Sequence, residues 1–102
     1  MTVSNLRPRL AMVRDGAGLT DVELSALLGV SRTTLFFWTS GRYEPRGPLK
    51  QRLIAFTLEG LCAAMHRGLL PLPAALERSA RAARLAGMRT KLIERFYAQP
   101  GG

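Results

Sequence analysis

Apolar positions recur every three or four residues along most of the chain, and no segment alternates strictly as a β-strand does. Glycine and proline fall between the periodic segments. The pattern therefore predicts an all-α protein, with helices over residues 5–15, 20–29, 31–41, 49–66, 74–86 and 88–98. In the helix over 49–66, the side chains expected to form the apolar face are Leu49, Leu53, Phe56, Leu61 and Met65.

Local end signals bound the first three helices. Ser4 or Asn5 is placed to cap the first helix. Thr20 with Glu23 three residues later is a capping-box sequence, which predicts the start of the second helix. Ser31 is the expected cap of the third helix.

Residues 31–45, SRTTLFFWTSGRYEP, raise a specific question about the third helix. Leu35 and Trp38 are three residues apart and share one side of a helix, which we expect to be buried. Phe36 and Phe37 then point away from that side, although they are large and apolar. Two interpretations stay open: these rings contact a partner, or they pack under the loop at 42–48 or a C-terminal helix.

Two short helices joined by a glycine-containing turn are typical of a helix-turn-helix. The positions that carry this pattern are Leu24, Ser25, Leu28, Gly29, Val30, Ser31, Leu35, Trp38, Gly41 and Pro45. Over about residues 5–65 the chain resembles the helix-turn-helix of the phage Cro and repressor (Xre-like) type, a domain of four or five helices. Ser25 departs from the more usual alanine, and Phe36 and Phe37 stand where polar residues are common.

The resemblance implies that the third helix enters the major groove of double-stranded DNA. The side chains then expected to contact bases are Arg32, Thr33, Phe36, Phe37 and Ser40. An apolar ring in that groove has the C5-methyl group of thymine as its natural contact. The side chains expected at phosphates are Thr20, Ser31, Arg42, Tyr43, Arg46 and Lys50.

The chain continues beyond the resemblance with apolar residues too numerous for a free tail. We expect a DNA-binding domain over 1–67 and a C-terminal segment over 68–102, whose two helices Gly87 separates. This segment is predicted to form a homodimer. The side chains assigned to dimerisation are Leu85, Met88, Leu92, Ile93, Phe96 and Tyr97. The alternatives are that these helices fold back to enlarge the core, or that they hold a protein partner.

Composition narrows the choice of partner. The net charge is +8, from 15 basic and 7 acidic residues, which favours a polyanion. The charge is uneven, because residues 49–102 hold nine basic and three acidic residues. One cysteine excludes an internal disulfide and indicates a cytoplasmic setting. No segment is long and apolar enough for a membrane span, so no membrane partner is expected.

Catalysis has little support in the sequence. The only histidine, His66, lies four residues from the only cysteine, Cys62, with no third ligand nearby, so no metal and no cofactor are expected. We therefore expect a non-enzymatic, dimeric repressor of a bacterium, phage or plasmid that binds a palindromic operator. Two alternatives stay open: an antitoxin or co-regulator with a protein partner, and a basic module that binds RNA or an anionic surface without sequence specificity.

Overall fold

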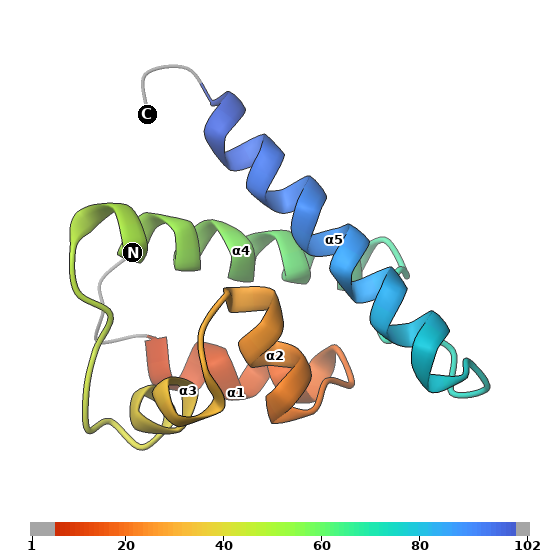
Figure 1. Ribbon diagram of the computed structural model, residues 1–102, viewed down its shortest axis with the longest axis horizontal. Coiled ribbons are helices and arrows are strands. Elements are labelled where there is room, and N and C mark those ends of the chain that lie inside the picture. Colours follow the sequence, from red (N-terminus) through yellow and green to blue (C-terminus); the bar gives the residue numbers. More distant parts are fainter. Residues whose placement is uncertain (1–5, 100–102) are drawn as a thin grey trace.

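Five helices account for most of the computed structural model, which describes residues 6–99 (Figure 1). The helices are α1 (Leu6–Gly16), α2 (Asp21–Leu28), α3 (Arg32–Thr39), α4 (Pro48–His66) and α5 (Arg78–Ala98). No strand occurs among the described residues, so the predicted all-α class is confirmed. The expected cap of the first helix, Ser4 or Asn5, lies outside the described residues.

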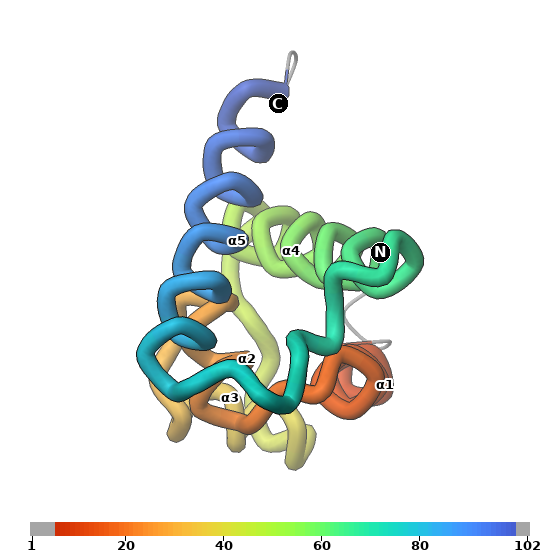
Figure 2. The backbone as a smooth tube through the Cα atoms, turned by 90° about the vertical axis from the view of Figure 1, so that its right-hand side faces the viewer, coloured from red at the N-terminus to blue at the C-terminus, as the bar shows by residue number. Residues whose placement is uncertain are grey.

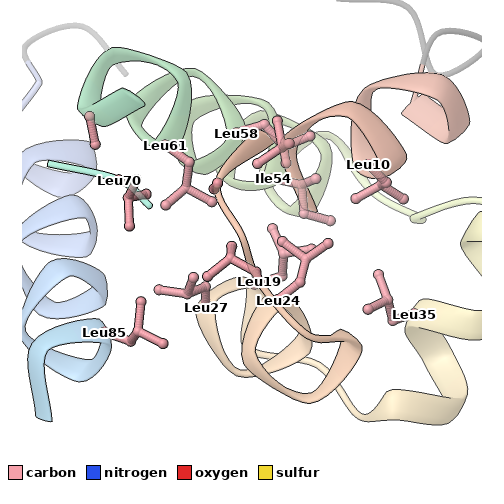
Figure 3. Close-up of a cluster of buried hydrophobic side chains, with 14 of the residues drawn as sticks. Leu10, Leu19, Leu24, Leu27, Leu35, Ile54, Leu58, Leu61, Leu70 and Leu85 are labelled. Carbon is pink, nitrogen blue, oxygen red and sulfur yellow. The ribbon is translucent and has the colours of Figure 1, made fainter. Parts of the chain in front are cut away.

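One hydrophobic core joins all five helices. α3 packs on α1 and α2, α4 packs on α1 and α2, and α5 packs on α2 and α4. The core side chains point inward between these helices (Figure 3). The largest that are fully buried are Leu10, Leu24, Leu35, Leu58, Leu61 and Val13.

The turn between α2 and α3 follows the local chemistry that the sequence predicts. The Thr20 hydroxyl accepts from the Glu23 N–H at 3.1 Å, and the Glu23 carboxylate accepts from the Thr20 N–H at 2.9 Å. Gly29 ends α2 at a φ of +72°, in the left-handed region that glycine adopts without a Cβ clash. The Ser31 hydroxyl then accepts from the Thr34 N–H at 3.1 Å. Both predicted caps are confirmed.

The buried face of α4 differs from the predicted one. Leu49 is 49% exposed, and of the five predicted side chains only Leu61 is fully buried. The buried residues are Ile54, Thr57, Leu58, Leu61 and Ala64. The reason is that α4 has neighbours on more than one side, with α1 and α2 on the core and α5 beside it. Apolar residues are therefore found around much of α4, and the predicted apolar face is rotated away from the side that is in fact most buried.

The C-terminal segment also differs from the prediction. Residues 78–98 form one helix, and Gly87 lies inside it instead of separating two helices. Gly87 is exposed, so its position costs only the propensity difference of about 1 kcal/mol relative to alanine. Residues 74–77 precede the helix and are not helical.

Leu85 and Leu92 are buried in the chain's own core, where α5 packs on α2 and α4. The prediction that these two side chains pair with a second copy is therefore wrong. Burial inside the subunit removes these apolar side chains from water, so no second copy is needed to cover them. One core cluster also spans both sides of residue 67, the predicted boundary between two domains.

Two glycines inside helices provide a matched test of this packing. Gly60 of α4 faces α5, and Gly87 lies within α5. Gly87→Ala is expected to raise the free energy of unfolding by about 1 kcal/mol, because a methyl group there meets nothing within 4 Å. Gly60→Ala is expected to lower it, because a methyl group there would overlap the Leu92 side chain. Urea unfolding measures both; equal effects of the two substitutions would contradict the described contact between α4 and α5.

Candidate nucleic-acid interface

The rotation of α3 about its own axis decides which side chains it presents. Leu35 is 2% exposed and Trp38 is 5% exposed, so this side of the helix is held in the core. Phe36, on the other side, is 62% exposed. Arg32, Thr33 and Ser40 are exposed as well. The outward face of α3 is therefore free within the subunit, as the sequence predicts.

Phe37 lies at the edge of this face and is half-buried. Its ring meets the Tyr43 ring edge-on, with 5.0 Å between centroids, and lies 6.1 Å from the Phe36 ring. The Arg42 guanidinium lies over the Phe37 ring at 5.6 Å. Of the two interpretations of this residue, packing against the loop at 42–48 is therefore present, through Tyr43. The same packing places Arg42 beside the outward face of α3.

The chain turns sharply after α3 and brings two of the predicted phosphate-binding residues, Arg42 and Tyr43, next to it. The Phe37 carbonyl accepts from the Arg42 N–H at 2.9 Å and from the Ser40 hydroxyl at 3.2 Å. Pro45 is buried, and its carbonyl accepts from the Gln51 side chain at 2.9 Å. The four predicted side chains of this segment that stay exposed are Arg42, Tyr43, Arg46 and Lys50.

The N-termini of α2 and α3 differ in charge. The first turn of α2 contains Asp21 and Glu23, whereas the first turn of α3 contains no acidic residue. Arg14 offsets Asp21 through an ion pair of 3.0 Å, and hydrogen bonds to Asp15 and Asp21 raise the pKa of its guanidinium. The N-terminus of α3, at Ser31, is therefore the more favourable of the two for a phosphate.

Three arginines that the sequence analysis did not single out lie near these helices. Arg81 of α5 forms an ion pair of 2.5 Å with Glu23, and it donates to the Gly18 carbonyl at 2.7 Å. The guanidinium groups of Arg89 and Arg7 lie against Gly29 and Gly41, the glycines on either side of α3. All three contacts join residues distant in sequence, so no local spacing signal predicts them.

A helix-turn-helix family model matches residues 10–55 of the chain. Comparison with curated proteins and with solved structures finds no match. The matched segment contains α2, the turn and α3, so this part of the chain is a helix-turn-helix of the Cro and repressor type, as predicted. The fold and the free face of α3 define a DNA-binding protein, and the family defines a regulator of transcription. α5 lies outside the matched residues.

Two further observations concern the described residues as a whole. Among residues 6–99, no helix is long and apolar enough to cross a membrane. Within the same range, no group of three or more histidine, cysteine, aspartate or glutamate side chains could hold a metal ion.

The ion pair between Glu23 and Arg81 gives a prediction with a defined pH dependence. Glu23→Gln keeps an acceptor for the Thr20 N–H but removes the charge opposite Arg81, so we expect a loss of about 1–2 kcal/mol in the free energy of unfolding at neutral pH. The Arg81 hydrogen bond lowers the pKa of Glu23 below its ordinary value of 4.5. The advantage of the native residue is thus complete above 4.5 and disappears as the pH falls through the lowered pKa.

Urea unfolding of both proteins over a pH series measures this difference. A difference that stayed constant down to strongly acidic pH would contradict the assignment, because it could not come from the Glu23 charge.

Proposed function

We propose that the protein is a sequence-specific repressor that binds a palindromic operator as a homodimer, with α3 in the major groove. The observation that carries the proposal is the 62% exposure of Phe36 on a helix whose other side is buried. Single exposed apolar residues are common on protein surfaces, but Phe36 adjoins the ring of Phe37, which in turn meets Tyr43, and such a group of neighbouring rings favours a contact surface. A module that needed only charge would have no use for it.

The chemistry of the exposed face of α3 suits the major groove. Phe36 can meet a thymine C5-methyl group, and Thr33 can add a methyl contact or a hydrogen bond. Arg32, at the N-terminus of the helix, can contact guanine or a phosphate. Phe37 supports this face from its edge, through its contacts with Phe36 and Tyr43.

Phosphate contacts would come from both ends of α3. Ser31 stands at its N-terminus, where backbone N–H groups are free of intrahelical partners. Arg42, Arg46 and Lys50 follow the helix and are exposed. Contacts at the two ends would fix the register of α3 in the groove without reading sequence themselves.

The dimer surface that we propose is the apolar side of α5 that its own subunit leaves open. Tyr97 is 64% exposed, and its ring meets that of Phe96, which in turn meets Phe56 of α4. These rings, with Leu49, border a hollow of about 480 Å³. A second copy of this surface would cover them, and Ile93 is half-buried on the same helix.

A protein partner is the second candidate for α5, in a co-regulator or antitoxin that also binds DNA. The observation in its favour is a hollow of about 880 Å³ between α2 and α5. The small or apolar side chains that line it include Val22, Ala26, Ala82 and Ala86. Small side chains allow a helix of a partner protein to pack closely on this surface. This candidate applies if the purified chain is a monomer and does not form a homodimer.

The proposed function requires no catalytic group. A repressor that binds bacterial, phage or plasmid DNA would act in the cytoplasm, where that DNA is found. Selection of bound fragments from a random duplex pool would identify the operator and its symmetry. A single asymmetric site would argue against the palindromic operator.

Phe36→Ala tests the role of the exposed ring. The free energy of binding to the selected duplex is expected to weaken by about 1–3 kcal/mol, and the loss should be confined to duplexes with thymine at the contacted position. Fluorescence anisotropy with thymine and uracil at that position measures the methyl contribution. Urea unfolding should show little change, because the ring is largely exposed already. Equal weakening on every duplex would mean that Phe36 does not read sequence.

Tyr97→Arg tests the proposed dimer surface. The added charge would be buried at the centre of the interface, so light scattering at a fixed protein concentration is expected to shift from dimer to monomer. Met12→Arg is the matched control, since Met12 is an exposed apolar residue on α1 and should leave the dimer unchanged. A native protein that scatters as a monomer would instead favour the protein-partner candidate.

A further inference from the structure

Four basic side chains gather on one side of the molecule, away from the residues assigned to the operator. We call Arg67, Arg84, Lys91 and Arg95 the basic stripe. Arg67 follows the C-terminus of α4, and the other three lie on α5. Arg67, Lys91 and Arg95 line a hollow of about 130 Å³ together with apolar residues of α4 and α5, and no acidic residue lines it.

The positions of the stripe on α5 form a line rather than a cluster. Arg84, Lys91 and Arg95 are separated by seven and four residues, so they share one side of the helix. From Arg84 to Arg95 this line extends about 16 Å, at the rise of an α-helix. Such a length is too great for all of its charges to meet one small anion, and it suits a polyanion whose charges are themselves in a row.

The stripe also carries its charge without internal compensation. All four side chains are exposed, and none of them forms an ion pair with another described residue. Arg14 and Arg81, by contrast, are held by carboxylates of their own subunit. Arg67, Lys91 and Arg95 line one hollow and repel one another, and a bound polyanion would relieve that repulsion.

Lys91 and Arg95, in the C-terminal half of α5, lie at a different end of the molecule from the outward face of α3, whereas Arg84 lies in the N-terminal half of the same helix. α3 packs on α1 and α2, whereas the hollow of the stripe is formed by α4 and α5. Two views at right angles agree that α3 lies at one end and the C-terminal half of α5 at the other (Figures 1 and 2). A straight duplex that holds α3 in its major groove would therefore not reach Lys91 or Arg95.

We propose that the basic stripe binds the phosphate backbone of a second DNA segment while α3 occupies the operator. This rests on the proposed function for the first segment only. A duplex has a phosphate for about every 3.4 Å along each strand, so a row of cations can neutralise several at once. The protein would thereby join two DNA segments, and the second segment would be bound without regard to its sequence.

A two-duplex experiment tests the proposal with the full chain. Beads carry a duplex with the selected operator, and a fluorescent duplex of unrelated sequence is added with and without protein. We expect the native protein to retain the fluorescent duplex, and added salt to release it before the operator.

Lys91→Glu changes the net charge from +8 to +6 and is expected to reduce retention of the fluorescent duplex about tenfold or more. Operator binding by the same variant should stay within about threefold, because Lys91 is remote from α3. Arg78→Glu is the matched control: it makes the same charge change on the same helix, outside the stripe, and should retain the fluorescent duplex.

The possible outcomes separate the two proposals. Native protein that holds the operator but retains no fluorescent duplex overturns the stripe proposal and leaves the proposed function intact. Equal losses for Lys91→Glu and Arg78→Glu overturn it too, since net charge alone would then explain retention. Native protein that prefers no selected duplex, yet binds random DNA through Lys91, would overturn the proposed function instead.

Discussion

The burial of Leu35 and Trp38 fixes the rotation of α3, and the features of the DNA-binding surface depend on it. Both side chains enter the core where α3 packs on α1 and α2. Because successive residues of a helix differ by about 100°, this anchoring turns both Phe36 and Phe37 away from the core, and Tyr43 and Arg42 then cover part of the Phe37 ring. A different rotation would bury Phe36 and leave Trp38 bare. The packing of Leu35 and Trp38 in the core thus determines which side chains of α3 face solvent.

α5 completes the domain at the side of α2 that faces away from α3. Leu85 and Leu92 enter the common core, and Arg81 holds Glu23, a member of the capping box that begins α2. α2 is therefore enclosed between α3 and α5, with Gly29 at the turn. The helix-turn-helix is thus supported by a helix outside the family-matched segment, and a change in the position of α5 would act directly on α2 and α4. The same helix presents three members of the basic stripe, Arg84, Lys91 and Arg95, in exposed positions.

Features set by neighbouring residues could be predicted from the sequence. The caps at Thr20 and Ser31, the left-handed Gly29 and the two sides of α3 follow from spacings of four residues or fewer. Features that depend on which helix packs where could not. The continuity of α5 through Gly87, the burial of Leu85 and Leu92 and the ion pair between residues 23 and 81 depend on tertiary contacts. Apolar spacing shows that a face is buried but does not identify its partner.

The contacts of Phe37 link the two kinds of DNA contact that the interface would make. Its ring touches Phe36, which faces outward, and also Tyr43 and Arg42, which begin the loop at 42–48. The Phe37 carbonyl additionally accepts from the Arg42 N–H. Because one residue holds both groups, the distance between the proposed base contacts and the proposed phosphate contacts would be fixed before DNA is bound. Such preorganisation reduces the entropy lost on binding, and it makes an operator of the wrong register unfavourable at both groups together.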